Sequence, residues 1–217
     1  FPYTTLFRSN GRDWWLIQPM SGSNGYHVFL IEGNNINYHH KQYLGNSKVL
    51  GSEMAGQAAF SHQGDKYFRY DHINDLDLYD FDRCSGYLSN YIHIPIIDSI
   101  DNLSSSGAVS GAAISLNDRY LYVSSWIYLY QFDLLAPNIA ASKDTAAIYD
   151  NFMFGITPTT FSFLQSAPDD KIYSLVSNAP YLHVIDSPNI GGIGCSVIQR
   201  GINTNFNNTF HPSFPHY

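Results

Sequence analysis

The sequence predicts an all-β protein built from one repeated unit, and three observations support this. Short stretches alternate aromatic or β-branched residues with small or polar ones, and no helical apolar period of 3.6 residues is present. The stretch Gly111–Leu134 shows the unit most fully, as a strand, a tight turn at residues 117–119 and two further strands. The unit recurs with spacings of 52, 53 and 52 residues between turn aspartates, which are Asp13, Asp65, Asp118 and Asp170.

A second anchor gives the same period independently. It is the acid that closes the third strand, with spacings of 50, 51 and 53 residues between Glu32, Asp82, Asp133 and Asp186. Such a repeat of strands and turns is typical of the blades of a β-propeller, in which each blade is a four-stranded sheet stacked on its neighbours. We therefore predict four blades of about 52 residues, at about 10–50, 51–105, 106–158 and 159–217.

The first nine residues, FPYTTLFRS, do not fit the repeat. They look like the translation of a short sequencing adapter, so we expect residues 1–9 to be non-native and to lie outside the fold. The alternative is a genuine upstream strand.

The first blade begins at Asn10, and its Trp14 and Trp15 stand where later blades carry Tyr or Ile. Large side chains that follow the turn are expected to pack between blades, at Trp14, Tyr67, Tyr120 and Ile172. His39 and His40 fall in a polar connection. A metal site there would need further His, Cys or carboxylate ligands at a defined spacing, which the surrounding sequence does not offer.

The second blade holds the most acidic segment, DHINDLDLYDFDR at residues 71–83. A calcium loop would need an oxygen ligand at the third position and glycine at the sixth, but Ile73 and Leu76 stand there. Strand alternation explains the segment better. We expect its apolar residues Leu76, Leu78 and Phe81 to face neighbouring sheets. The acids expected to face water or turns are Asp75, Asp77, Asp80 and Asp82.

The remaining strands follow from the same alternation. Innermost strands are expected at residues 58–60, 112–114 and 164–166, and fourth strands at 91–94, 146–149 and 196–199. The fourth strand of the first blade is too irregular to place. Loops are expected at residues 98–110 and 136–144, where small and polar residues gather.

Composition limits the possible partners. The net charge is −7 and the 11 Lys and Arg residues are scattered, which argues against nucleic-acid binding. No stretch approaches the roughly 18 apolar residues that span a membrane, so no membrane insertion is expected. Cys84 and Cys195 fall in blades two apart, beyond the reach of a disulfide, and are expected to be free thiols with structural roles.

The sequence favours a non-catalytic binding or scaffold module over an enzyme. A propeller enzyme, such as a metal-dependent lactone hydrolase or polysaccharide lyase, would need His, Asp, Glu or Asn at the channel ends of several innermost strands. The innermost strands here are mostly small or apolar, so we expect no catalytic residue, metal or cofactor. Further blades could supply such ligands, and the enzyme therefore stays as the alternative.

Several motifs, taken in order, resemble a known family: GRDWWLI, GQAAFSHQGDKY, SLNDRYLYVSS, APDDKIYSLV and LHVIDSPNIGGIGC. They are similar to the WD-repeat-like propeller of large secreted bacterial proteins linked to gliding motility and type IX secretion. The resemblance implies a ring of about seven blades, of which this chain would be the C-terminal half and would form an open arc. It also implies an exported cell-surface protein with a protein or glycan partner, and association through the open ends of the arc.

Overall fold

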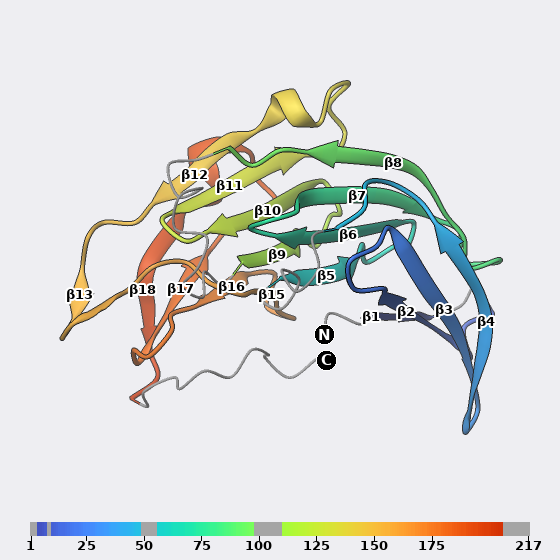
Figure 1. The fold of residues 1–217 in the computed structure, drawn as a ribbon. Coiled ribbons are helices and arrows are strands. Elements are labelled where there is room, and N and C mark those ends of the chain that lie inside the picture. Colours follow the sequence, from blue (N-terminus) through green and yellow to red (C-terminus); the bar gives the residue numbers. More distant parts are fainter. Residues whose placement is uncertain (1–3, 8–9, 49–55, 98–109, 206–217) are drawn as a thin grey trace. The chain divides into compact units, whose positions relative to one another are not determined.

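The computed structural model describes residues 4–7, 10–48, 56–97 and 110–205 (Figure 1). Within these residues the chain forms four four-stranded sheets and one two-stranded sheet, and every four-stranded sheet takes its strands in sequence order. This all-β arrangement of blade-like sheets confirms the predicted β-propeller fold class. The chain divides into two compact units, Phe1–Ser104 and Ser105–Tyr217, called unit 1 and unit 2.

Unit 1 contains the first two sheets. The first sheet consists of β1 (Thr4–Phe7), β2 (Trp14–Pro19), β3 (Gly25–Glu32) and β4 (Asn35–Tyr43). The second consists of β5 (Gln57–Phe60), β6 (Lys66–Asp71), β7 (Asp75–Phe81) and β8 (Leu88–Ile94). Buried aromatic and aliphatic residues of both sheets form one apolar core.

Unit 2 contains the other sheets. The first of them consists of β9 (Ser110–Ile114), β10 (Tyr120–Ser125), β11 (Tyr128–Asp133) and β12 (Asp144–Ile148). The last consists of β15 (Leu164–Ser166), β16 (Ile172–Leu175), β17 (Tyr181–Ile185) and β18 (Val197–Asn203). Between them lie the hairpin of β13 (Met153–Phe154) and β14 (Thr157–Pro158), and 3₁₀ turns occur at η2 (Ala140–Ser142) and η3 (Gly192–Cys195). Among the described residues, no helix is long and apolar enough to cross a membrane.

Two strands differ from expectation in the first sheet. Thr4–Phe7 pairs antiparallel with β2 as β1, as the alternative of an upstream strand requires; that residues 1–9 are non-native stays a prediction. The backbone edge of β2 would otherwise be unpaired, and such an edge can pair with any extended segment, native or not. His39 and His40 lie within β4 rather than in a connection, and a β-bulge makes His39 the extra residue opposite Val28 and Phe29.

The first turn of each later blade contains one residue with left-handed backbone geometry. Gly64, Asp118 and Asp170 take this position, with φ of 74°, 56° and 64°. Asp65 therefore lies one residue beyond the position of Asp118 and Asp170. In the first blade Gly11 has the left-handed geometry, with φ of 69°, and Asp13 lies two residues beyond it, so the predicted alignment of the aspartates fails in the first two blades. Glycine and aspartate both tolerate this geometry, so an alignment on aspartate alone can slip there.

Asp13 has a different role from the other turn acids. It is only 1% exposed, and the amide of Asn10 and the guanidinium of Arg12 donate to its two oxygens at 2.6 and 3.0 Å. The backbone N–H of Asp13 donates in return to Asn10 Oδ1 at 3.1 Å. Asp13 thus holds the turn before β2 together with a charge that solvent barely reaches.

A cross-strand ion pair recurs in the later blades. A basic residue after the turn pairs with an acid on the third strand or directly after it, as Lys66–Asp80, Arg119–Asp133 and Lys171–Asp186. Asp133 and Asp186 are the predicted closing acids. In the second blade the predicted acid, Asp82, instead accepts the backbone N–H of Cys84 at 2.8 Å and the hydroxyl of Ser85 at 2.5 Å.

The two adjacent tryptophans of the first blade point to opposite faces of their sheet. Trp15 is fully buried in the core of unit 1, and its indole N–H donates to the carbonyl of Arg83 at 2.9 Å. Trp14 is only half-buried. Tyr67 and Ile172 are buried between sheets as predicted, whereas Trp15 rather than Trp14 occupies the core in the first blade. Alternation along a strand makes a one-residue error change the face.

The sheets of unit 2 meet through an apolar core and through polar contacts. Tyr120 and Tyr122 pack in this core with Ile172 and Ile185. The amide of Gln131 joins Tyr122 to the start of η3: it donates to the Tyr122 hydroxyl at 2.6 Å and accepts the N–H of Gly192 at 2.8 Å. The inner strands β9 and β15 approach closely at Gly111.

Both cysteines are free, as predicted. Cys195 is buried in the core of unit 2, where burial raises the pKa of its thiol. Cys84 is exposed in the turn after β7, so it packs in no core, and the structural role predicted for it is not supported. Asp82 caps this turn, and the Cys84 side chain points into solvent.

Candidate functional site

Four antiparallel strands joined in order place the second turn of a blade and the connection to the next blade at the same end of the sheet. We call this end the connection end of each unit. In unit 1 its described residues are 20–24, 44–48, 72–74 and 95–97, and in unit 2 they are 126–127, 149–163 and 176–180. Loops that a rigid scaffold gathers in this way commonly carry function.

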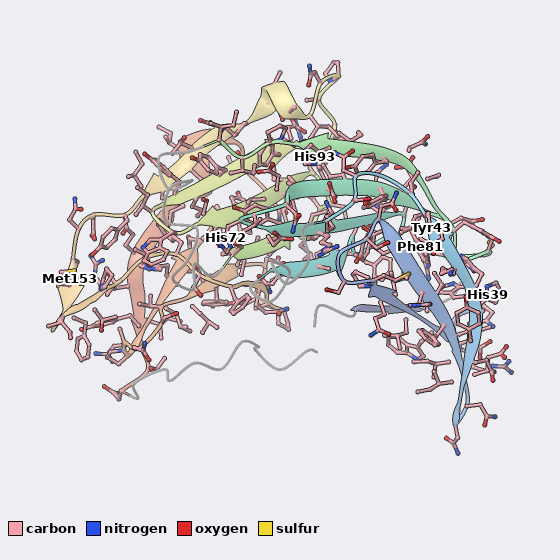
Figure 2. The ribbon with its side chains drawn as sticks, in the orientation of Figure 1. His39, Tyr43, His72, Phe81, His93 and Met153 are labelled. Atoms are coloured by element: carbon pink, nitrogen blue, oxygen red, sulfur yellow. The ribbon has the colours of Figure 1, made fainter. Side chains whose placement is uncertain are left out.

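Asp77 of β7 is fully buried near the connection end of unit 1. Lys48, from the connection after β4, forms an ion pair with one carboxylate oxygen. The Tyr91 hydroxyl donates to the other oxygen at 3.0 Å, and Nδ1 of His93 lies 3.0 Å from that same oxygen. His93 lies on β8 (Figure 2). Its Nε2 is 3.6 Å from Asp75, so the ring contacts two acids.

The prediction that Asp77 faces water is therefore wrong. Leu76 and Leu78 are buried as expected, but the opposite face of β7 is covered as well. A carboxylate is tolerated there because Lys48 supplies the opposite charge and two further groups satisfy its lone pairs. Asp80 and Asp82 do reach solvent in part.

A second buried pair lies beside it on β6. Nη2 of Arg69 is 3.7 Å from Oδ2 of Asp71, and both side chains are at most 3% exposed. The other oxygen of Asp71 accepts the backbone N–H of Ile73 at 3.1 Å and of Asn74 at 2.7 Å. Burial raises the pKa of Asp71, and the hydrogen bonds from Asn74 and the charge of Arg69 oppose that rise. Asp71 thus stabilises the tight turn between β6 and β7.

Three tyrosines close the cluster toward the apolar core. The hydroxyls of Tyr26 and Tyr79 lie 2.8 Å apart and hydrogen-bond across the two sheets. Burial raises the pKa of Tyr26 to about 12 and that of Tyr67 well above its ordinary value. The Tyr67 hydroxyl has no hydrogen-bond partner among the described residues. These hydroxyls stay protonated at neutral pH, so they can orient neighbouring groups but cannot act as bases.

The connection end of unit 2 has a different character. The hairpin β13–β14 projects from the connection between the two sheets, and Met153 lies on it (Figures 1 and 2). Its apolar side chains reach solvent: Phe152, Met153, Phe154 and Ile156, the last 94% exposed. Gly155 has a φ of 62° at the tip, a left-handed geometry that glycine adopts without strain.

The base of the hairpin is held by aromatic and ionic contacts. Tyr181 meets the rings of Phe152 and Phe154 edge to face, at centroid distances of 6.2 and 5.8 Å. The guanidinium of Arg200 lies 4.4 Å from the centre of the Phe152 ring and forms an ion pair with Asp150. That hydrogen-bonded pair lowers the pKa of Asp150.

His183 of β17 anchors the same region from below. Its Nε2 donates to the carbonyl of Thr159 at 2.9 Å and its Nδ1 accepts the backbone N–H of Arg200 at 3.0 Å. Both contacts require a neutral ring with the proton on Nε2. Burial lowers the pKa of His183 to about 4, which agrees with this tautomer. The ring is therefore a fixed structural link rather than an available base.

The residues singled out from the sequence are not brought together in one site. Asp13 and the turn acids Asp65, Asp118 and Asp170 lie in separate first turns, and Asp133 and Asp186 lie in surface ion pairs. Within the described ranges, no group of three or more His, Cys, Asp or Glu could hold a metal ion. The residues of interest at the connection ends are others.

Sequence reasoning missed these groups for identifiable reasons. Neither Lys48 nor Arg69 belongs to a recognisable motif in the sequence. Only the fold shows that each contacts a buried acid. His93 was placed on a fourth strand without a role. The run of four apolar residues around Gly155 was a usable signal for an exposed hairpin, because a turn glycine interrupts it.

Comparison with known proteins supports the fold alone. No family model matches the sequence, and no curated protein matches it. Solved structures do match: a proposed 6-phosphogluconolactonase from Bacteroides fragilis is 13% identical, with 92% of this chain and 55% of that chain covered and a TM-score of 0.53. A streptogramin B lyase is 10% identical, with 94% and 55% covered and a TM-score of 0.52.

A third match is a protein from Lactobacillus plantarum, 14% identical, with 83% of this chain and 49% of that chain covered and a TM-score of 0.53. The chain thus spans about half the length of the solved structures it matches. At these identities the likeness shows the fold and no activity. The chain has the β-propeller fold.

Proposed function

We propose that this chain is a non-catalytic binding module and that the β13–β14 hairpin contacts its partner. The observation that carries the proposal is the exposed apolar tip, with Ile156 94% exposed and Met153 47% exposed. Exposed apolar groups that cluster on one projection mark interaction sites more often than isolated ones do. The partner is a protein with an apolar recess, because aliphatic side chains make up the most exposed part of the tip.

The base of the hairpin supports this reading. Arg200 and Tyr181 hold the Phe152 ring, and the Asp150–Arg200 ion pair closes the base. A tip that is already ordered loses less conformational entropy on binding. The charged groups at the base satisfy one another, so the tip itself presents no charge to the partner.

The state of the buried ionisable groups supports a non-catalytic role. Asp77 is occupied by Lys48, Tyr91 and His93, and His183 is occupied at both ring nitrogens. A general base needs a free lone pair within reach of a substrate. The sequence resemblance adds the location of the proposed module, at the surface of a bacterial cell.

Site-specific cross-linking tests the proposal. The full chain carrying a photoreactive phenylalanine analogue at position 156 is added to envelopes of the native host, with position 135 as control, since Leu135 is also exposed, at 73%. A discrete adduct at position 156 only is expected. The captured protein, once purified, should bind Ile156→Asp at least about tenfold more weakly than the wild type.

Two results would count against the proposal. One is equal cross-linking at both positions, or equal binding of the captured protein to Ile156→Asp. The other is turnover by the purified chain: hydrolysis of 6-phosphogluconolactone or opening of a streptogramin B, the compounds named for its structural neighbours. Either activity would favour the enzyme alternative.

A further inference from the structure

The first sheet of unit 1 has an apolar face that its neighbour does not cover. Cross-strand pairing arranges this face in two rows, Trp14–Ile31–Ile36 and Leu16–Phe29–Tyr38. Ile36 is 65% and Tyr38 57% exposed, and the others are half-buried. On the opposite face Trp15, Ile17, Val28 and Leu30 are buried against the second sheet. We call the two rows the Tyr38 face.

The last sheet of unit 2 has a comparable face. Its rows are Tyr173–Val184–Ile198 and Leu175–Leu182–Ile202. Ile198 is 46% and Ile202 38% exposed, although Val184 is buried. The opposite face, which carries Ile172 and Ile185, packs on the preceding sheet. We call these two rows the Ile198 face. Soluble monomers rarely expose contiguous apolar sheet faces of this kind.

The two faces are of complementary kinds. In unit 1 the leading sheet packs with its Trp15 face on the Tyr67 face of the sheet that follows. In unit 2 the leading sheet packs with its Tyr122 face on the Ile172 face of the next. We call the face that a blade turns toward the next blade in sequence its forward face, and the other its backward face. Each interface within a unit thus joins the forward face of one blade to the backward face of the following blade. The Tyr38 face is a backward face and the Ile198 face is a forward face.

From this continuity with the blade interfaces we propose that copies of this chain associate head to tail. The Ile198 face of one copy packs on the Tyr38 face of the next, as one blade packs on another. Neither pair of rows contains Asp, Glu, Lys or Arg. The two rows of each face are therefore apolar, and charged residues adjoin them: Lys41 in the next row of the first sheet, and the Lys171–Asp186 ion pair beside Tyr173 and Val184. The contact forms between chains that each carry a net charge of −7. Salt should strengthen it, because screening weakens the repulsion between copies.

Sedimentation of the full chain over a range of concentrations tests the proposal. The wild type is expected to associate, more strongly in 0.5 M than in about 0.05 M salt. Tyr38→Lys and Ile198→Lys, each alone, should weaken association at least about tenfold, because each places a charge in one half of the contact. Leu135→Lys, at a 73% exposed position outside both faces, is the matched control and should associate like the wild type. Ile156→Lys tests separately whether the hairpin makes the contact. Circular dichroism confirms that each variant folds.

A mixture of the two variants separates head-to-tail contact from its alternatives. Tyr38→Lys keeps an intact Ile198 face, and Ile198→Lys keeps an intact Tyr38 face. The mixture should therefore form one-to-one dimers that grow no further, while neither variant alone does so. Concentration-dependent protection of residues 28–38 and 197–202 from hydrogen exchange in the wild type is an expected result that needs no variant.

Three outcomes would overturn the proposal. The first is a wild type that stays monomeric at roughly 50 μM, a concentration well above the dissociation constant of a specific contact. In that case the sheet of another protein or another blade covers these faces. Loss of association in Tyr38→Lys but not in Ile198→Lys means that like faces pair. Dissociation by Ile156→Lys assigns the contact to the hairpin.

Discussion

At the scale of single residues, buried ionisable groups set the conditions under which the fold is stable. His183 is neutral in the folded chain, where burial lowers the pKa to about 4 from the ordinary value of 6.5. Between these pH values the unfolded chain binds a proton that the folded chain does not. The contribution of His183 to stability is thus complete above about pH 6.5 and is lost as the pH falls toward 4.

His183→Gln should flatten this pH dependence. The wild type is expected to lose on the order of 3 kcal/mol of unfolding free energy between pH 6.5 and 4, at about 1.4 kcal/mol for each pKa unit. Urea denaturation at several pH values measures it, with His62→Gln as the matched substitution at an exposed histidine. Equal slopes for the wild type and His183→Gln would contradict the assignment. The low pKa of Asp150 places its own contribution at more acidic pH.

The buried pair of Lys48 and Asp77 leads to a second expectation. Lys48→Met leaves a buried carboxylate without its counter-charge, which costs about 3 to 5 kcal/mol. Adding Asp77→Asn to Lys48→Met should recover a large part of that loss, because the amide needs no counter-charge. Chemical denaturation of the single and double variants measures the coupling.

Lys66→Met is the matched control for that pair. Lys66 and Asp80 are each more than a third exposed, so the same substitution there should cost less than about 1 kcal/mol. Similar losses in Lys48→Met and Lys66→Met would show that the ion pair of Asp77 reaches solvent.

At the scale of strands and sheets, the contact between inner strands leaves no room for a side chain. A Cβ at Gly111 would lie 2.4 Å from the carbonyl oxygen of Ser162 and 2.6 Å from the backbone nitrogen of Leu164. Gly111→Ala must therefore separate β9 from β15, with a loss of about 1 to 3 kcal/mol or more. Gly155→Ala is the control, since only its φ opposes a side chain and a loss of about 1 kcal/mol is expected. Equal thermal shifts would contradict the close approach.

Sequence periodicity predicted the strands of the later blades because alternation and the turn aspartates mark them directly. It failed where one residue decides the outcome. Glycine and aspartate both tolerate a left-handed turn position, so the sequence aligns Asp65 with Asp118 although Gly64 holds that position. Asp77 was assigned to water because its partner Lys48 lies on another blade, and no local pattern shows such a contact. The bulge at His39 interrupts the alternation along β4, so the sequence pattern did not predict that strand.

At the scale of the whole chain, charge and apolar faces act in opposite directions. Mutual repulsion at a net charge of −7 keeps copies apart at neutral pH, and it vanishes near the isoelectric point of about 5.6. We expect light scattering by the wild type to rise steeply between about pH 7 and 5.6. The double variant Tyr38→Lys/Ile198→Lys should scatter less at its own isoelectric point. Equal scattering, with circular dichroism unchanged, would show that the apolar faces do not contribute.

The position of Trp15 makes it an internal optical probe. Trp15 lies on the first sheet, and its indole N–H donates to the carbonyl of Arg83, which follows β7 of the second sheet. The ring also lies over Gly86, where an added Cβ would come within 2.8 Å of it. The His39 ring stands edge-on to the indole, at a centroid distance of 5.0 Å. With Trp14 and Trp126 replaced by Phe, the emission wavelength of the remaining tryptophan would report separation of the two sheets.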